Sequence, residues 1–215
     1  MKTVTAVVLL VPALCATSAR AQLVDDSLGA RQKLAEAGYR YDDTASLLSA
    51  LQDENETVAG FATTFLAEQR ATPEIIGALR AAGGSPLESV ALGAFSALQR
   101  LGATGWEGSA SGLMQGTRDD IMRLELAGIL AKAGRSEGWA FVKAALSDPG
   151  LMVHAVRAAA HFDGLKTPDG EVDAVAEIER IRDQAQGAPF KLYEINASVQ
   201  QVHARRQKAP RKSGE

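Results

Sequence analysis

Apolar residues recur along the chain at the spacing of one helix face, and the same set returns at a fixed interval. Each set holds three positions four residues apart, which places its side chains on one face of an α-helix. Each copy begins 32 residues after the previous one. The copies are Val58, Ala62 and Leu66, then Val90, Ala94 and Leu98, then Met122, Leu126 and Leu130. This repetition is typical of a protein built from stacked helical repeats.

A second column of apolar residues keeps nearly the same interval. Leu79, Leu113 and Leu146 are separated by 34 and 33 residues, and the pair Gly105-Trp106 recurs as Gly138-Trp139. Two columns that repeat together indicate two helices in each repeat. We therefore expect an all-α fold, a right-handed α-solenoid of antiparallel helix pairs.

Start signals for several helices lie between these columns. Thr72 precedes Pro73, which favours an N-cap followed by proline in the first helical position. Ser85 and Glu88 have the spacing of a capping box, and Thr117 to Asp120 has a similar pattern. These signals predict helices that begin near residues 73, 86 and 118.

The remaining segments are assigned by the same patterns. We expect a signal peptide at 1–21, an arm or short helix at 22–42 that ends at Gly38, and the repeat solenoid at 43–186. A capping helix at 187–204 and a basic disordered tail at 205–215 complete the chain. No segment shows the short apolar alternation of a strand, and Thr167-Pro168 is predicted to open a long charged helix.

The first 21 residues resemble a secretory signal peptide. Lys2 is followed by a short apolar run that ends at Cys15, and Ala19-Arg20-Ala21 fits a cleavage site. The run is too short for a membrane span, and Leu14 is too bulky for a lipoprotein site at Cys15. We expect export to a periplasm or the exterior, a mature chain that starts near Gln22 without cysteine or disulfides, and no transmembrane segment in that chain.

The charge of the chain argues against a general nucleic-acid binder. The formal net charge is −3 at pH 7, and removal of Lys2 and Arg20 makes the chain more acidic. Proteins that bind nucleic acid mostly carry a basic surface that neutralises phosphates. We therefore expect no nucleic-acid partner.

The repeat resembles the short HEAT type, also called the phycobilisome-lyase type. That pattern has an Asp-rich turn, then valine, alanine four residues on and leucine four further, and Asp53, Val58, Ala62 and Leu66 match it in order. The resemblance covers roughly residues 44 to 186. It implies a HEAT- or armadillo-like stack of helix pairs and says almost nothing about function. Ala59 and Ala91 depart from the pattern, in which arginine is usual.

The strongest candidate for chemistry is a set of polar residues on one helix face. His154, Arg157 and His161 share that face, with Asp163 nearby, and could bind an anion or a metal ion. The alternative is a solvated face, since no third ligand has the standard spacing of a metal site. We find no catalytic motif, including in the serine-containing stretch at 108–112, and we predict no cofactor and no metal.

A second candidate is a groove on the concave face of the predicted solenoid. Phe141 is predicted to point away from the core, near columns of small residues, and Glu74, Ser111 and Gln115 would share that face. Such a groove could admit a segment of a protein partner. The alternative is that the small residues only allow close helix packing. Trp106 and Trp139 are predicted to pack in the core.

These patterns favour a non-enzymatic protein-binding or scaffolding role. A solenoid exposes a large extended face and lacks the deep pocket that catalysis usually needs. The resemblance leaves open a bilin-lyase-like enzyme or enzyme subunit, although those lyases are expected to work inside the cell. A third hypothesis is an accessory subunit of an envelope complex.

Overall fold

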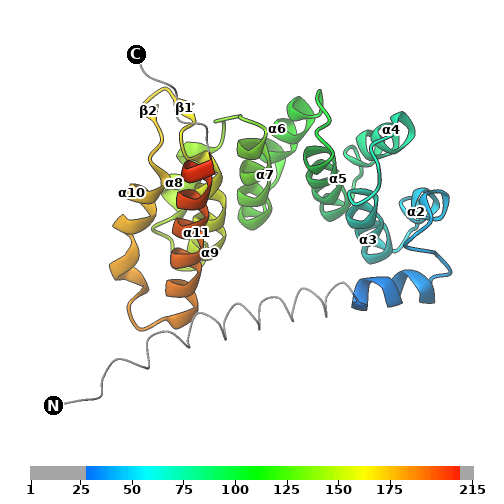
Figure 1. Ribbon diagram of the computed structural model, residues 1–215, viewed down its shortest axis with the longest axis horizontal. Coiled ribbons are helices and arrows are strands. Elements are labelled where there is room, and N and C mark those ends of the chain that lie inside the picture. The colour runs from blue at the N-terminus through cyan, green and yellow to red at the C-terminus, as the bar shows by residue number, and fades with distance from the viewer. Residues whose placement is uncertain (1–27, 209–215) are drawn as a thin grey trace. The chain divides into compact units, whose positions relative to one another are not determined.

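The computed structural model describes residues 28–208. The predicted signal peptide at 1–21, residues 22–27 of the predicted arm and residues 209–215 of the predicted tail lie outside this range. The chain divides into two compact units, Met1–Ala71 and Thr72–Glu215. Helices dominate both units (Figure 1).

The first unit contains a helical segment at 28–36 and two further helices, α2 (Thr44–Ala50) and α3 (Glu56–Leu66). Asn55 caps α3, because its side-chain oxygen accepts hydrogen bonds from the backbone N–H groups of Thr57 and Val58. α2 packs against α3, and Leu34, Leu47 and Leu66 are fully buried. The predicted stop at Gly38 coincides with a positive φ of 85°, which glycine adopts without strain.

The second unit holds eight α-helices, two short 3-10 helices and a β-hairpin. The elements in chain order are α4 (Pro73–Ala82), α5 (Glu88–Arg100), α6 (Glu107–Gly116), α7 (Asp120–Lys132), α8 (Trp139–Ala145), α9 (Met152–Ala159), η1 (Ala160–Phe162), β1 (Lys166–Thr167), β2 (Gly170–Glu171), α10 (Ala174–Arg180), η2 (Arg182–Ala185) and α11 (Pro189–Lys208).

Helix α7 is the centre of this unit. It packs against α5 on one side and α9 on the other, and α6 lies along it (Figure 1). Leu124, Leu126 and Leu130 of α7 are fully buried. The helix is apolar around most of its circumference because neighbours cover several of its faces. All nine residues of the first repeated column are buried.

The helix pairs differ from the predicted ones in one respect. The sequence suggested that each repeat pairs residues such as 122–130 with the following helix at 136–147. In the structure the main neighbour of α6 is α7, and the main neighbour of α8 is α9, whereas α7 and α8 contact each other less. The short helix of each repeat therefore packs mainly against the long helix that follows it.

The predicted helix starts are confirmed in part. The Thr72 hydroxyl accepts a hydrogen bond from the N–H of Ile75, with Pro73 in the first turn. The predicted capping box of Ser85 and Glu88 does not form. Leu87 is the N-cap of α5, and the Glu88 carboxylate accepts a hydrogen bond from the Thr117 hydroxyl at 3.1 Å instead. α7 is capped by Asp119 rather than by Thr117.

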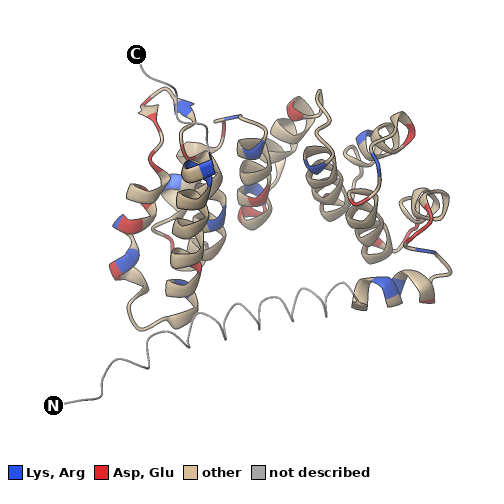
Figure 2. Ribbon diagram, viewed as in Figure 1, with Lys and Arg blue, Asp and Glu red and all other residues tan. Residues whose placement is uncertain are grey.

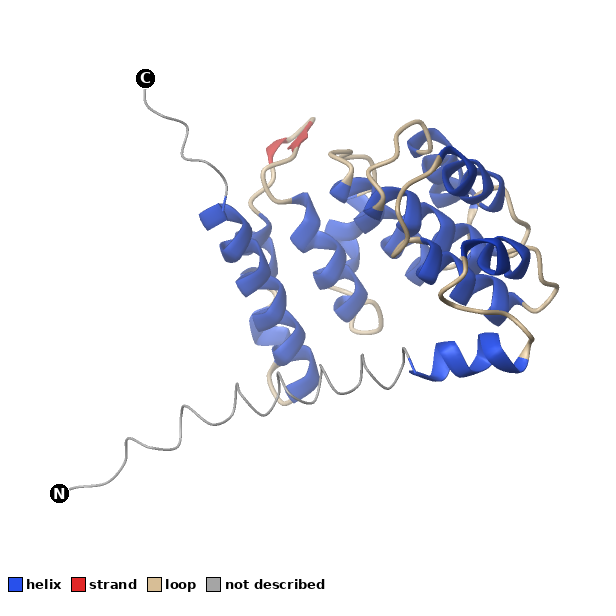
Figure 3. Ribbon diagram, turned by 45° about the vertical axis from the view of Figure 1, so that its right-hand side comes forward, coloured by secondary structure: helices blue, strands red, loops and turns tan. Residues whose placement is uncertain are grey.

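The prediction that the chain has no strand is wrong. Lys166 pairs with Glu171 and Thr167 pairs with Gly170 in an antiparallel hairpin, drawn in red in Figure 3. The Thr167 hydroxyl donates to the Gly170 carbonyl at 2.9 Å and accepts from the Asp169 N–H, so it serves the turn rather than a helix start. The charged helix begins only at Ala174, where Asp173 is the N-cap.

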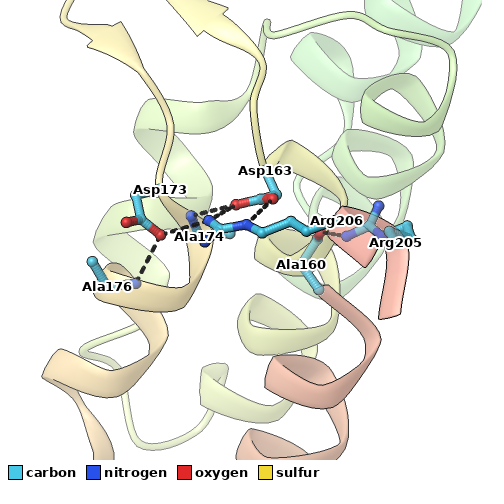
Figure 4. Close-up of polar contacts among 7 residues, drawn as sticks. All are labelled: Ala160, Asp163, Asp173, Ala174, Ala176, Arg205 and Arg206. Carbon is cyan, nitrogen blue, oxygen red and sulfur yellow. Dashed lines mark hydrogen bonds and ion pairs between the residues drawn. The ribbon is translucent and has the colours of Figure 1, made fainter. Parts of the chain in front are cut away.

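The predicted tail is also partly wrong, because α11 continues to Lys208. The Arg206 guanidinium bonds both Asp163 and Asp173, and Arg205 donates to the carbonyl of Ala160 (Figure 4). These contacts hold residues 205–208 in a helix that was predicted to end at 204. Among residues 28–208, no helix combines the length and the apolar character that a membrane crossing requires.

Candidate functional site

A small pocket with basic walls lies between α7 and α9. Its volume is about 50 Å³, and we call it the basic pocket. The side chains that define its chemistry are Glu125, Lys132, Arg157 and His161. α7 supplies Glu125 and Lys132, whereas α9 and η1 supply Arg157 and His161. The pocket thus depends on the packing of two helices.

Gly128 lies where α7 faces α9 beside His161. A Cβ atom at this position would lie 3.5 Å from Cα of Ala158 and 3.8 Å from Cδ2 of His161. Any longer side chain would enter the space beside the imidazole. The small residues on both helices, glycine on α7 and alanine on α9, therefore leave this space open.

His161 is a neutral imidazole at neutral pH. Burial, together with the nearby positive charges of Lys132 and Arg205, lowers the pKa of His161 to about 4. Each of these effects disfavours the protonated ring. At pH 7 the ring can therefore donate one hydrogen bond and accept another.

The cations around His161 repel one another. Burial lowers the pKa of Lys132, with a further contribution from Arg100 and Arg205, while Glu125 acts in the opposite direction. Burial likewise lowers the pKa of Arg205, opposed by Asp163. Neither Lys132 nor Arg100 has a hydrogen bond or ion pair to any other residue of 28–208. Figure 2 shows basic residues on α7 and α11. An anion in the basic pocket would relieve this repulsion.

The predicted patch of His154, Arg157 and His161 is divided among different neighbours. His154 Nδ1 lies 3.2 Å from Oε1 of Glu125. The Arg157 guanidinium donates two hydrogen bonds to the buried carboxylate of Glu194 on α11, at 2.9 and 2.6 Å. Arg157 and His161 line the basic pocket, whereas His154 is not part of its lining. Within residues 28–208, no three His, Cys, Asp or Glu residues are placed to hold a metal ion.

The residues of the predicted groove lie on three separate helices. Glu74 begins α4 and is exposed, Ser111 and Gln115 are one turn apart on α6, and Phe141 is on α8. The amide of Gln115 lies 3.5 Å from the Ser111 hydroxyl. No hydrogen bond or ring contact within the described part of the chain joins Glu74, this pair and Phe141 to one another.

Phe141 is not the exposed phenylalanine that the sequence suggested. Its ring is half-buried, and the Arg123 guanidinium of α7 lies 4.2 Å from the ring centroid, a cation–π arrangement. The small residues of the groove are not explained by close packing either. A Cβ atom at Gly77 or Gly108, two of these small residues, would meet no atom within 4 Å.

Comparison with known proteins gives no relative. No protein-family model matches this chain, and neither does any curated protein. The HEAT-type pattern therefore stays a resemblance in the sequence.

Sequence reasoning missed Lys132, which lines the basic pocket, and the cations Arg100 and Arg205 near it. Arg205 was placed in the tail, and no local pattern connects it with His161. A signal for the other two was present, because Arg100 and Lys132 are 32 residues apart, which is the period of the repeat. They end α5 and α7, two helices in contact.

Proposed function

We propose that this protein is an exported, non-enzymatic binding or scaffolding protein whose basic pocket receives a carboxylate of a protein partner. Its frame would be the right-handed solenoid of HEAT- or armadillo-like helix pairs that the sequence indicates. The observation that carries the proposal is the basic residues near His161, among which Lys132 has no hydrogen bond or ion pair to another residue of 28–208 and lies near the further cations Arg100 and Arg205.

The size of the pocket supports recognition of a charged group on a larger partner. A volume of about 50 Å³ accommodates a carboxylate or a small oxyanion, whereas pockets that enclose whole small molecules are several times larger. It is too small for an open-chain tetrapyrrole, so it gives no support to the bilin-lyase hypothesis. A side-chain carboxylate of a docked protein fits both the volume and the charge.

The packing of the second unit supports the solenoid frame. α7 contacts both α5 and α9, which carry the equivalent columns of the neighbouring repeats, and nearest-neighbour packing is typical of repeat proteins. Arg100 and Lys132 then extend the basic group across two repeats. Export rests on residues 1–21 and is part of the same proposal.

The test uses a defined acidic probe. A short blocked peptide of alternating glycine and glutamate is titrated into the purified protein, while the ring resonances of its three histidines are followed by NMR. We expect the peptide to raise the pKa of His161, because a bound carboxylate stabilises the protonated ring. Lys132→Met should weaken binding by roughly threefold or more, and Lys33→Met, which alters an exposed pair with Glu36, should not.

Two results would contradict the proposal. One is equal binding of the same peptide with glutamine in place of glutamate. The other is equal binding by the parent protein and Lys132→Met. A partner from an envelope extract supports the proposal only if Lys132→Glu abolishes its capture and Lys33→Glu does not. Phe141→Glu tests the predicted groove in the same experiment.

A further inference from the structure

A larger cavity lies beneath the β-hairpin, and its chemistry is opposite to that of the basic pocket. It encloses about 220 Å³ between α8, the hairpin and the start of α10, and we call it the hairpin pocket. Four carboxylates line it, with one lysine. Figure 2 shows these acidic positions in red along the hairpin and α10. The acidic residues are Asp169, Glu171, Asp173 and Glu177.

Two of these carboxylates are already neutralised. The Glu177 carboxylate lies 2.6 Å from Nζ of Lys143 and 3.2 Å from Nε of Arg180. The Asp173 carboxylate accepts from Arg206 at 2.8 Å and from the N–H of Ala176 at 3.2 Å. Asp169 and Glu171 have no side-chain hydrogen bond or ion pair with any residue of 28–208. The uncompensated negative charge therefore lies on the hairpin.

The indole of Trp139 forms an apolar wall with an unused donor. Trp139 is 7% exposed and packs on Phe162, with ring centroids 5.3 Å apart. Its N–H has no acceptor within the described part of the chain. The equivalent Trp106 differs, since its N–H donates to the carbonyl of Ala103 at 2.9 Å. Buried tryptophan N–H groups usually have a partner.

The side chain that carries this free N–H lines the cavity. Within residues 28–208, the one fully buried side-chain nitrogen or oxygen without a partner is Nε of Arg31. The Trp139 N–H is therefore not sealed in the core, and the hairpin pocket is the opening that its side chain lines. The pocket thus combines a hydrogen-bond donor, an aromatic wall and two free carboxylates.

We propose that the hairpin pocket binds a small organic ammonium ion that also carries a neutral oxygen acceptor. Asp169 and Glu171 would hold the ammonium group, and the Trp139 N–H would donate to the oxygen. A ligand carboxylate is disfavoured by the acidic rim. A divalent metal ion is disfavoured as well, because no three acidic or histidine side chains of residues 28–208 are grouped to coordinate one.

The probe is glucosamine, which combines an ammonium group with hydroxyl oxygens. The chain has two tryptophans, so their indole N–H resonances are assigned with Trp139→Phe and followed during the titration. We expect the Trp139 signal to move and the Trp106 signal to stay. N-acetylglucosamine has the same ring without the charge, and its affinity should be lower by roughly tenfold or more.

Two substitutions should act in opposite directions. Glu171→Gln should weaken glucosamine binding roughly three- to tenfold, because it removes an uncompensated charge. Lys143→Met should strengthen it by roughly twofold, because it removes the cation that competes inside the pocket. Glu68→Gln, an exposed carboxylate of the other unit, should leave the affinity unchanged.

The proposal fails under any of four results. N-acetylglucosamine could shift the Trp139 signal at the same concentrations as glucosamine. Calcium chloride could produce the same shift, which would indicate a metal site. Glu171→Gln and Lys143→Met could change the affinity in the same direction, which would indicate a general disturbance of the hairpin. A titration without any change at Trp139 would also overturn it.

Discussion

The guanidinium of Arg157 on α9 holds the carboxylate of Glu194 on α11 through two parallel hydrogen bonds of 2.9 and 2.6 Å. Glu194 is 7% exposed, whereas the Arg157 side chain is 49% exposed. The pair fixes the long C-terminal helix against the repeat helices. It also accounts for Arg157, which the sequence placed in a ligand site.

Loss of this pair should destabilise the second unit. Arg157→Ala leaves the buried Glu194 carboxylate without its main partner, and we expect the free energy of unfolding to fall by about 1–3 kcal/mol. The lower part of that range allows for solvent around the half-exposed arginine. Chemical denaturation at pH 7 measures the loss.

A double-mutant cycle separates the pair from other effects of the truncation. In an Arg157→Ala background, Glu194→Gln should cost less than it does in the parent protein, because the charge it removes is already unpaired. Additive changes would show that the two residues do not interact in solution.

His161 should make stability depend on pH between about 4 and 6.5. Its pKa is about 4 in the folded protein and 6.5 for a free histidine, so the unfolded chain binds more protons in this window. The free energy of unfolding therefore falls as the pH falls through the window and is unaffected by this group above it. The full loss is about 3 kcal/mol.

The measurement is denaturation of the parent protein and His161→Gln at several pH values from 7 to 4. Carboxylates titrate near the lower limit, and they contribute to both proteins. The difference between the two curves gives the contribution of the His161 ring. The charged groups near this ring are Lys132 and Glu125 of α7, Arg157 of α9 and Arg205 of α11. His203→Gln, an exposed control, should retain the parent slope. If the free energy of unfolding of His161→Gln had the same dependence on pH as that of the parent protein, a buried neutral ring at His161 would be excluded.

The helices of this protein are predictable because their signals are local. The columns that begin at Val58, Val90 and Met122 are buried throughout. Residues four apart share one face of a helix, and that face packs against the core. Thr72 could be assigned as a cap for the same reason. Its hydroxyl bonds a backbone group three residues away.

The hairpin and the basic pocket were missed because they depend on longer-range contacts. Val172 and Val175 have helical spacing, but Pro168 and Gly170 define a turn that the periodicity hides. Lys132, His161 and Arg205 come from three different elements, and residues on one helix face give no information about them. Residues 205–208 were assigned to the tail because the contact that holds them comes from Asp163, 43 residues from Arg206.

Two glycines of the second unit should respond to alanine with opposite signs. At Gly128 a Cβ would make ordinary contacts, the nearest at 3.5 Å, so Gly128→Ala should stabilise the protein by about 0.5–1 kcal/mol through helix propensity. At Gly138 φ is 99°, and a Cβ would lie 3.0 Å from Cβ of Ala127. Gly138→Ala should therefore destabilise it by about 1–3 kcal/mol.

Gly112→Ala measures the effect of helix propensity without a contribution from packing. This position is in the middle of α6, and a Cβ would meet nothing within 4 Å. Thermal and chemical denaturation of the three variants gives the comparison. A loss of stability in Gly128→Ala, with the expected gain in Gly112→Ala, would show that α7 and α9 are already too close at the basic pocket.

Arg206 fastens the two ends of the hairpin to α11, and its removal should loosen them. Asp163 before β1 and Asp173 after β2 both bond this guanidinium, and each also accepts a backbone N–H, from Ala174 and Ala176 respectively (Figure 4). In Arg206→Ala we expect hydrogen exchange at these two amides to accelerate by roughly five- to thirtyfold. The pKa of Asp173, which Arg206 holds below its ordinary range, should rise as well.

Arg182→Ala is the matched control, because it breaks a bidentate pair with Glu179 nearby and should leave both amides as protected as in the parent. Equal acceleration of hydrogen exchange in the two variants would show that the C-terminal helix opens as a whole and that Arg206 does not specifically stabilise the hairpin.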